Sequence, residues 1–390
     1  MQRESLHTMI IGAGAAGLAV GACLRRAGVP VQILEQADRV GSLWHGLYER
    51  FHLDTDKGTS ALPFMPYPAD VPRYPSRQHV IDYLTAYARQ FGLQPRFGEK
   101  VTAAYREADR WLVETEHARY DAINLVIATG HNRVPRRVRW PGQDAYQGLI
   151  LHSSDYRHGR PFRGQNVLVV GFHSSAGDIA IDLHECGAKP GMAVRGGVNV
   201  VPRDLLGIPI VKISMLQAKL PCALSDALNV PVLWLVFGSL RRYGLRHRSY
   251  GPITEIWRDG RIPHIDVGTM KLLRQGHITV YPGLSRFTPG GVVFDDGREV
   301  AFDAVILATG YRAAVDDFVR EAAVLKDGDP VGSGATSPVP GLYFCGFRIT
   351  PAGLLHDIGI EARQISAAIA RQRAVSSIRA EANDVIGRAP

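Results

Sequence analysis

An α/β fold built from two similar units is predicted by three features of the sequence. An apolar run ends in the turn Gly12-Ala13-Gly14-Ala15-Ala16-Gly17, and a helix-forming run follows it. A second apolar run ends in a related turn that begins at Gly171, again with a helix-forming run behind it. Two later strands both end in Ala-Thr-Gly, at residues 128–130 and 308–310. Because strand, glycine turn and helix in this order are typical of Rossmann-like dinucleotide-binding domains, we expect two of them, the second inserted in the first.

The first unit has the complete G-x-G-x-x-G spacing. Gly12 lets the strand turn, Gly14 lets the backbone approach a pyrophosphate, and Gly17 lets helix and strand pack closely. The amides at the helix start, from Ala15 and Ala16, then face the phosphates. Glu35 ends the next apolar run, 23 residues after Gly12, where an acid accepts hydrogen bonds from a ribose. The alternative is a glycine-rich turn with a surface glutamate.

The second unit repeats this arrangement with the opposite charge. Arg195 lies 24 residues after Gly171, at the position of Glu35. A glutamate there repels a ribose 2′-phosphate, whereas an arginine binds one through charge-assisted hydrogen bonds. The pair therefore predicts FAD, or another nucleotide without that phosphate, in the first unit and NADPH in the second. Alternatively, Arg195 is a surface arginine at a strand end.

His173 replaces the middle glycine of the second turn. A side chain at this position would crowd the pyrophosphate. Either the loop is wider, with Ser174 and Ser175 donating their hydroxyls, or binding of the nicotinamide cofactor is altered.

Composition narrows the class of protein further. Two or three domains are expected for 390 residues. Cys23, Cys186, Cys222 and Cys345 form no CxxC pair, which disfavours a disulfide framework, a metal site and a dithiol redox centre and fits the cytoplasm. The net charge of +8 suits an anionic ligand, and no basic run with interleaved aromatics points to nucleic acid.

One apolar stretch raises the question of contact with a membrane. Asn229 to Leu240 is too short to cross a bilayer as a helix and contains Pro231. No transmembrane segment is expected. A buried helix or substrate-facing wall is the favoured interpretation, and a weak membrane-surface contact beside the arginines that follow is the alternative.

The order of elements divides the chain into three parts. We expect a first part of the FAD domain at residues 1–155, the NADPH domain at 156–303 and a second part of the FAD domain at 304–390. A capped helix is expected over Ser76 to Phe91, antiparallel strands over Phe97 to Tyr120, a hairpin at Asp295-Asp296-Gly297, and a last helix over Gly353 to Arg371.

Two segments after Glu35 carry candidate functional side chains. Trp44 follows a Gly-Ser turn, where it forms either core or a wall against a flat cofactor, and we favour the wall. Phe51 to Pro68 is proline-rich and predicts a loop. Its charged residues Asp54, Asp56 and Lys57 are either solvated or close to the reacting ring.

Tyr146-x-Gly148-x-x-x-His152-x-x-x-Tyr156 resembles the FxGxxxHxxxY signature of flavin-containing monooxygenases. Its final Tyr is similar to the nitrogen- and sulfur-oxygenating branch, whereas the Baeyer–Villiger branch usually has Trp there. Between about Met9 and Ala370, further segments are especially similar to the YUCCA-type enzymes that act on indole-3-pyruvate, and to their bacterial relatives: GSLWH, LPFMPYP, FRGQNVLVVG, VVPRDLLG, YGLRHRSYGP, ILATGY and GLYFCGF.

The resemblance implies an NADPH-dependent flavin monooxygenase. In that family a C4a-(hydro)peroxyflavin transfers one oxygen atom from O2 to a small organic substrate, by N- or S-oxygenation or by oxidative decarboxylation of an indole-pyruvate-like acid. The alternatives are an NADPH oxidase or flavin-dependent reductase without oxygen transfer, Baeyer–Villiger-type oxygenation, and a flavin-loaded sensor without turnover. A small lipophilic or indole-like substrate is expected, shaped by residues between Leu205 and Trp257, and a homodimer is a further expectation.

The resemblance also assigns residues. Asp54 and Lys57 match a catalytic N-x-x-K segment, with an acid in place of the amide. His152 and Tyr156 are expected to be interdomain structure. Gly171, Ser174, Ser175 and Arg195 match NADPH positions, and Gly12, Gly14, Gly17, Glu35 and Trp44 match FAD positions. Further cofactor contacts are expected from Ala15, Ala16, Gly41, Leu43, His52, Val101, Thr129, Gly130, Gly310 and Gly346.

Overall fold

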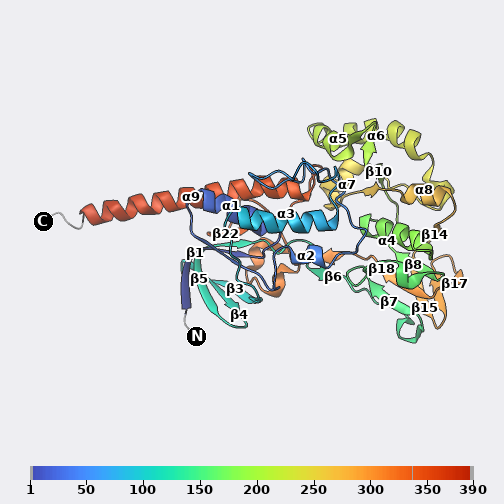
Figure 1. The fold of residues 1–390 in the computed structure, drawn as a ribbon, viewed down its shortest axis with the longest axis horizontal. Coiled ribbons are helices and arrows are strands. Elements are labelled where there is room, and N and C mark those ends of the chain that lie inside the picture. Colours follow the sequence, from blue (N-terminus) through green and yellow to red (C-terminus); the bar gives the residue numbers. More distant parts are fainter. Residues whose placement is uncertain (1–2, 336, 387–390) are drawn as a thin grey trace.

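A computed structural model describes residues 3–335 and 337–386 and contains two principal sheets with helices against them (Figure 1). In the first sheet, β1 pairs in parallel with β2 and β5, and β22 pairs in parallel with the end of β5. β3, β4 and β5 form an antiparallel meander, as the alternation over 97–120 predicts. The strands are β1 (Arg3–Ile11), β2 (Val31–Leu34), β3 (Val101–Glu107), β4 (Arg110–Thr115), β5 (Arg119–Ile127) and β22 (Leu342–Phe344).

The second sheet is parallel throughout, in the order β14-β9-β8-β18-β7. Its strands are β7 (Leu149–His152), β8 (Asn166–Val170), β9 (Lys189–Ala193), β14 (Thr279–Tyr281) and β18 (Ala304–Leu307). β7 and β18 therefore lie in this sheet, although the boundaries expected at 155/156 and 303/304 assign both to the FAD unit. We propose that the second unit extends from about β7 to β18.

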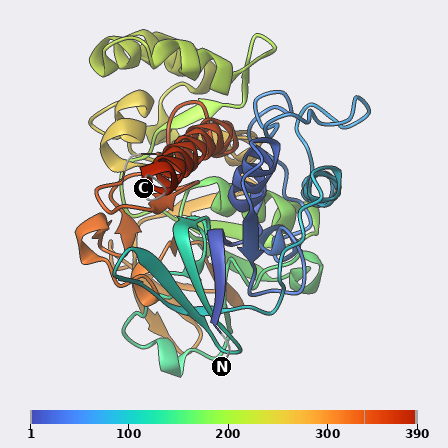
Figure 2. The same cartoon turned by 90° about the vertical axis from the view of Figure 1, so that its left-hand side faces the viewer.

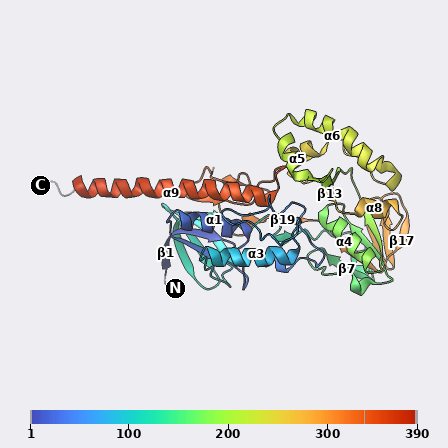
Figure 3. The ribbon, with the colours of Figure 1, turned by 45° about the horizontal axis from the view of Figure 1, so that its top comes forward.

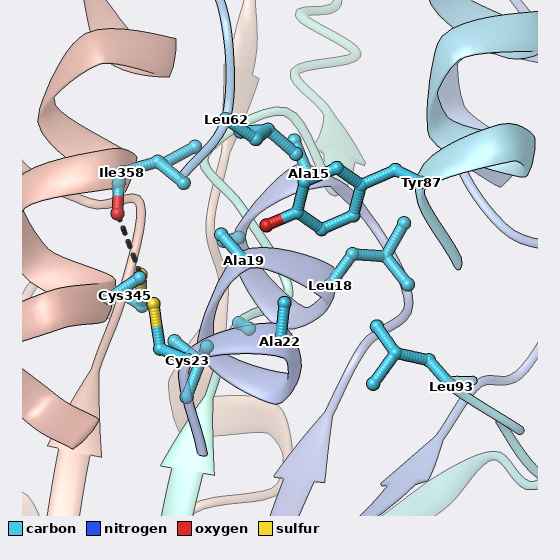
Figure 4. Close-up of a cluster of buried hydrophobic side chains, with 14 of the residues drawn as sticks. Ala15, Leu18, Ala19, Ala22, Cys23, Leu62, Tyr87, Leu93, Cys345 and Ile358 are labelled. Atoms are coloured by element: carbon cyan, nitrogen blue, oxygen red, sulfur yellow. Dashed lines mark hydrogen bonds between the residues drawn. The ribbon is translucent and has the colours of Figure 1, made fainter. Parts of the chain in front are cut away.

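Helices α1 (Ala15–Arg26) and α9 (Leu354–Ile386) pack together beside the first sheet, and Figure 2 views α9 nearly end-on next to α1. The contact is built from small and apolar side chains, among them Cys23 of α1 and Ile358 of α9, with Cys345 beside them (Figure 4). Helix α9 extends past the predicted end at Arg371 and beyond the first sheet (Figure 3).

Two further helices, after Ser76 and after the second glycine turn, begin where the sequence predicts. Helix α3 (Arg77–Gln90) is capped by Ser76, whose hydroxyl accepts a hydrogen bond from the His79 amide. Short α2 (Ser42–His45) follows β2, and α4 (Ser174–Glu185) follows the second glycine turn. The predicted hairpin at 295–297 joins β16 (Gly291–Phe294) to β17 (Glu299–Ala301), with β15 (Leu284–Thr288) on the other side of β16.

A helical region lies above the second sheet and contains α5 (Ile210–Gln217), α6 (Cys222–Phe237), α7 (Pro252–Asp259) and α8 (Thr269–Arg274) (Figures 1 and 3). Helix α6 is not the buried helix that its composition favours, because only three of its residues are buried. Short paired strands complete the fold: β6 (Val134–Pro135) with β19 (Tyr311–Arg312), β10 (Val200–Pro202) with β13 (His264–Asp266), β11 (Asp204–Leu205) with β12 (Ile208–Pro209), and β20 (Leu325–Lys326) with β21 (Asp329–Pro330).

Candidate functional site

The first glycine turn is shaped by close backbone contacts. Gly12 has φ +105°, and a Cβ there would lie 2.7 Å from the Ala128 carbonyl oxygen. A Cβ on Gly17 would lie 1.9 Å from the Gly12 oxygen. Gly14, by contrast, faces open space with no atom within 4 Å of its Cβ position. Two glycines therefore serve the fold, and the middle one leaves room for a ligand beside the start of α1.

The second turn has the same construction. Gly171 has φ +132°, and a Cβ there would lie 2.7 Å from the Ala308 oxygen. Ala308 begins the second Ala-Thr-Gly segment, as Ala128 begins the first. Each turn therefore packs against the end of the strand that carries this tripeptide, which gives the repeated sequence a structural reason.

His173 fits the second turn without strain. Its φ and ψ are −98° and −176°, close to the −79° and −172° of Gly14. Both residues are extended N-caps, a conformation that any residue adopts. The side chain of His173 is exposed, so the substitution keeps the backbone path of the loop and changes only what lines it.

Glu35 is buried behind the first turn. Its carboxylate accepts hydrogen bonds from the amides of Ala13 at 2.8 Å and Ala37 at 3.0 Å and from the Ser42 hydroxyl at 3.3 Å. It therefore holds the turn to the loop after β2 while facing the adjoining cleft.

A cleft runs along the carboxyl ends of the strands of the first sheet. Most of the residues predicted for the first cofactor line this cleft: Gly12, Gly14, Ala15, Ala16, Glu35, Leu43, Trp44, Val101, Thr129, Gly130 and Gly346. The hydroxyl of Thr129 is buried there without a hydrogen-bond partner among the described residues. An open glycine, a buried acid and an orphaned hydroxyl fit a dinucleotide such as FAD, whose ribose and phosphates need such partners.

Apart from the four residues matched to NADPH, four of the predicted cofactor residues do not line this cleft. Gly17 lies under the turn, and Gly41 starts α2 with φ +62° and donates its amide to the Ala13 oxygen at 2.9 Å. The Gly310 oxygen accepts hydrogen bonds from the Arg136 amide and from His152. His52 lines a different cavity, which also contains Asp54 and Asp178.

A cavity of about 430 Å³ lies between the two units. The first unit contributes Asp54 and the second Asp178, from α4. Tyr48 donates a hydrogen bond to Asp178 at 2.8 Å across the interface. The remaining lining is mainly basic or aromatic: Arg50, His52, Arg73, Tyr74 and Arg203, with Pro72 and Val267.

The two carboxyl groups of this cavity share an environment that disfavours their charge. Burial raises the pKa of Asp54, against the opposing effects of the Ser174 hydroxyl and of Arg203. Burial and the charge of Asp54 raise the pKa of Asp178. Perturbed acids in a cleft mark functional sites more often than average surface, so the pair can hold a proton where the two units meet.

Lys57, the other residue matched to the catalytic segment, is engaged elsewhere. Its ammonium group donates to the backbone oxygens of Pro68 at 3.1 Å, Ala69 at 2.9 Å and Val71 at 2.6 Å. This arrangement ties the proline-rich loop together. The neighbouring Asp56 is buried and accepts from the Thr59 hydroxyl at 2.7 Å.

Arg195 and Arg203 occupy different surroundings. Arg195 is exposed just after β9, with its side chain over Gly283 and its carbonyl accepting a hydrogen bond from Arg246. Two arginines thus gather where the second ribose is predicted. Arg203 instead lies over the Tyr74 ring, 4.1 Å from its centre, in the cavity between the units.

The signature residues are buried and structural. Tyr146 donates to the Phe302 oxygen at 2.8 Å, and Tyr156 donates to Asp182 at 2.5 Å. His152 ends β7 and contacts the Gly310 oxygen at 3.2 Å. These contacts tie the end of β7 to the loop after β18 and the segment after β7 to α4.

A separate apolar cavity of about 290 Å³ lies beneath α5 and α6. Its lining falls mostly in the span expected to shape a substrate pocket, and includes Leu205, Ile210, Ile213, Leu228, Leu233, Ile253 and Ile256. Lys212 of α5 lies 3.5 Å from Asp56, so α5 begins against the loop that carries Asp54.

Several residues of the first cleft were missed from sequence. Leu354, Leu355 and Ile358 reach it from the first turns of α9, and Lys100 and Arg133 line it from loops. The helix start after Gly353 is the signal that indicates the first three. The two basic residues have no motif that distinguishes them from surface charges.

Comparison with known proteins identifies the family. Residues 9–203 match the family model described as pyridine nucleotide-disulphide oxidoreductase. Indole-3-pyruvate monooxygenase YUCCA1 of Oryza sativa subsp. japonica is 39% identical over 361 residues, which cover 89% of this chain and 87% of that protein. The probable indole-3-pyruvate monooxygenase YUCCA4 of Arabidopsis thaliana is 37% identical, over 87% of this chain and 84% of that protein.

Solved structures share the fold. A flavin-containing monooxygenase from Stenotrophomonas maltophilia superposes with a TM-score of 0.72 at 23% identity, covering 95% of this chain and 99% of that one. An open structure of cyclohexanone monooxygenase superposes with a TM-score of 0.72 at 18% identity, covering 95% of this chain and 88% of that one.

Among the helices of the described residues, none combines the length and the apolar composition that a membrane span needs.

The two glycine turns have matching construction, since Gly12 and Gly171 each lie against the carbonyl of an Ala-Thr-Gly segment. The protein is an FAD- and NADPH-dependent monooxygenase. The chain belongs to the flavin-containing monooxygenase family, in the branch of the YUCCA enzymes.

Proposed function

We propose that this enzyme oxidatively decarboxylates a 2-oxo acid that carries an indole-like group. The observation that supports the proposal most is the 39% identity, along 89% of the chain, to a protein named indole-3-pyruvate monooxygenase. In the balanced reaction, the 2-oxo acid, O2, NADPH and a proton give the shortened carboxylic acid, CO2, NADP+ and water. One oxygen atom of O2 enters the acid and the other leaves as water.

We propose that the first cleft holds FAD. Gly14, Ala15 and Ala16 present the helix start to the pyrophosphate, Glu35 binds a ribose, and the Thr129 hydroxyl donates to the cofactor. Gly12, Gly17 and Gly41 shape the turn, and Leu43, Trp44, Val101, Gly130 and Gly346 form the walls. FAD supplies the oxygen chemistry when it is bound, and the protein positions it and limits the access of water.

The turn at Gly171 is proposed to hold NADPH. Ser174 and Ser175 begin α4 and present hydroxyls and amides to the pyrophosphate, while Arg195 binds the 2′-phosphate. Arg246 lies close enough to reinforce that charge. The nicotinamide half then extends toward the cavity that contains His52, Asp54 and Asp178.

Asp54 is proposed as a proton-holding residue at that interface, and Lys57 as a positioning residue. Asp54 contacts Ser174 at the start of α4 and shares its cavity with Arg203. Lys57 keeps the loop of Asp54 in place through its three carbonyl contacts. We further propose a cytoplasmic enzyme, since the four cysteines are free, and a homodimer.

The test is turnover of indole-3-pyruvate under labelled oxygen (18O2) with NADPH, followed by mass spectrometry of the acid. One labelled atom in the product is expected. If NADPH is consumed and all electrons appear as hydrogen peroxide, the second candidate is correct, an NADPH oxidase without oxygen transfer. The observation that favours this candidate is Asp54, an acid at the position where many flavin-containing monooxygenases carry an asparagine.

A further inference from the structure

Helix α6 is apolar on the side that faces outward. Val230 is 65% exposed, Trp234 68% and Leu235 80%. Leu216 on α5 is 67% exposed, Leu220 is exposed between the two helices, and Leu224 is exposed in the first turn of α6. We call these six residues the α5–α6 apolar face. Surface helices of folded proteins normally turn polar residues outward, so this face needs a partner.

The inner side of the same helices is apolar as well. Val232 and Leu233 of α6 and Ile213 of α5 line the cavity of about 290 Å³ below. Helix α6 is therefore apolar almost all round while lying at the surface, a pattern typical of a helix in contact with lipid. With 16 residues, it is too short to cross a bilayer.

The charges around this face have one sign. From Leu205 to Arg246 the chain carries five basic residues, Lys212, Lys219, Arg241, Arg242 and Arg246, and one acidic residue, Asp226. Asp226 is buried and accepts hydrogen bonds from the amides of Ile253 and Thr254 at the start of α7. The outer surface of this segment thus presents basic groups and no carboxylate.

Basic side chains also lie directly beside the most exposed apolar ones. Arg274 donates a hydrogen bond to the Val236 oxygen at 3.1 Å, in the last turn of α6. The guanidinium of Arg242 lies by Gly238, which ends the helix. Trp234 and Leu235 therefore have arginines at their border, and a tryptophan with such neighbours suits the interface between lipid headgroups and acyl chains.

We propose that the α5–α6 apolar face docks on the surface of a bilayer that contains anionic lipids. Val230, Trp234 and Leu235 enter the headgroup region, and Arg241, Arg242 and Arg274 meet the lipid phosphates. The charge complementarity distinguishes this partner from a second copy of this chain, since two such faces would bring like charges together. The proposal is independent of the substrate proposed above.

The experiment is flotation of the FAD-loaded full chain with vesicles of phosphatidylcholine, with or without about 30% phosphatidylglycerol. The unmodified protein is expected to float with the anionic vesicles, less with neutral ones and less in high salt. The double variant W234S/L235S is expected to bind the anionic vesicles roughly tenfold more weakly, or more weakly still. Arg241→Ala and Arg242→Ala are each expected to weaken binding to the anionic vesicles about fivefold.

Val331→Ser is the matched control, because Val331 is 69% exposed and lies outside this face. It is expected to float like the unmodified protein. Leu216→Ser on α5 provides a second test should W234S/L235S lose FAD. An unmodified protein that stays at the bottom, or W234S/L235S floating unchanged, would overturn the proposal. So would a dimer by light scattering that W234S/L235S abolishes without any vesicle binding, since a second copy would then be the partner.

Discussion

At the scale of single residues, the two glycine turns separate folding from ligand binding. Gly12 and Gly171 have left-handed φ values and no room for a Cβ, since each faces the carbonyl that ends a neighbouring strand. Gly14 has ordinary dihedrals and open space. The G-x-G-x-x-G pattern places Gly12 and Gly14 in one motif, and the structure shows that they carry different constraints.

Substitution of Gly12 and substitution of Gly14 should therefore give different results. Gly12→Ala is expected to destabilise the protein by about 1–3 kcal/mol because of strain and the contact with Ala128. Gly14→Ala should leave the free energy of unfolding of the FAD-free protein almost unchanged but weaken FAD binding. Urea unfolding and FAD titration measure the two effects. Loss of stability in Gly14→Ala, with FAD binding intact, would contradict this account.

Arg195 tests the second site in the same way. Charge-assisted hydrogen bonds contribute about 1.5–3 kcal/mol, so Arg195→Ala should raise the KM for NADPH about tenfold or more and leave that for NADH nearly unchanged. Lys189→Ala, on an exposed residue at the opposite end of β9, serves as the control. An equal preference for NADPH before and after the Arg195 substitution would remove its proposed role.

At the scale of elements, the sequence predicts whether a segment forms a helix or a strand better than it predicts what that segment packs against. The glycine turns, the capped α3, the meander and the hairpin all occur where the pattern places them. The short apolar strand Ala304–Leu307 fits any parallel sheet, and its composition does not tell which one it joins. Likewise, an apolar run at α6 does not reveal whether protein or another partner covers it. Both outcomes depend on long-range packing.

The candidate site shows the same division. Residues inside a motif, such as Glu35 and Gly14, could be placed in the first cleft from sequence. Asp178 could not, because it lies in the middle of α4 and reaches Asp54 only when the two units meet. Leu354 and Leu355 arrive from the far end of the chain.

The helical region has one polar anchor that can be tested. Asp226 of α6 caps α7 through the amides of Ile253 at 2.9 Å and Thr254 at 3.1 Å. Asp226→Ala should cost about 1–2 kcal/mol and speed amide hydrogen exchange in α6 and α7, with little change in the first sheet. Asp70→Ala, on an exposed turn, is the control. Unchanged exchange in α6 and α7 would show that other contacts hold these helices.

At the scale of the whole molecule, the two units are joined by polar contacts around a cavity. Tyr48 binds Asp178, Arg160 binds Glu49 through both carboxylate oxygens at 2.9 Å, and Tyr74 binds Asp204 at 2.7 Å. These contacts orient the two turns toward one interface. Because Asp178 is buried, the stability of this interface depends on pH.

The sign of that dependence follows from Asp178. Its pKa is raised from 3.8 to about 7, so its contribution to stability is fully present below pH 3.8 and is lost as the pH rises through about 7. Asp178→Asn cannot ionise and still accepts from Tyr48. As the pH rises from about 5 to about 8, the free energy of unfolding of the cofactor-free variant should increase, relative to that of the unmodified chain, by on the order of 2 kcal/mol. Urea unfolding measures this difference in stability, and a difference that does not grow with pH would contradict the assignment. The control Asp70→Asn should show no such pH-dependent gain in stability.

The central claim is that one chain binds FAD and NADPH together and passes electrons between them toward oxygen. Anaerobic addition of NADPH to the FAD-loaded protein tests it most directly, with the visible flavin absorbance as the readout. We expect NADPH to bleach the flavin, NADH to do so more slowly, and labelled oxygen admitted with the 2-oxo acid to enter the product. A protein that takes up no FAD, or whose flavin NADPH leaves oxidised, would contradict the account.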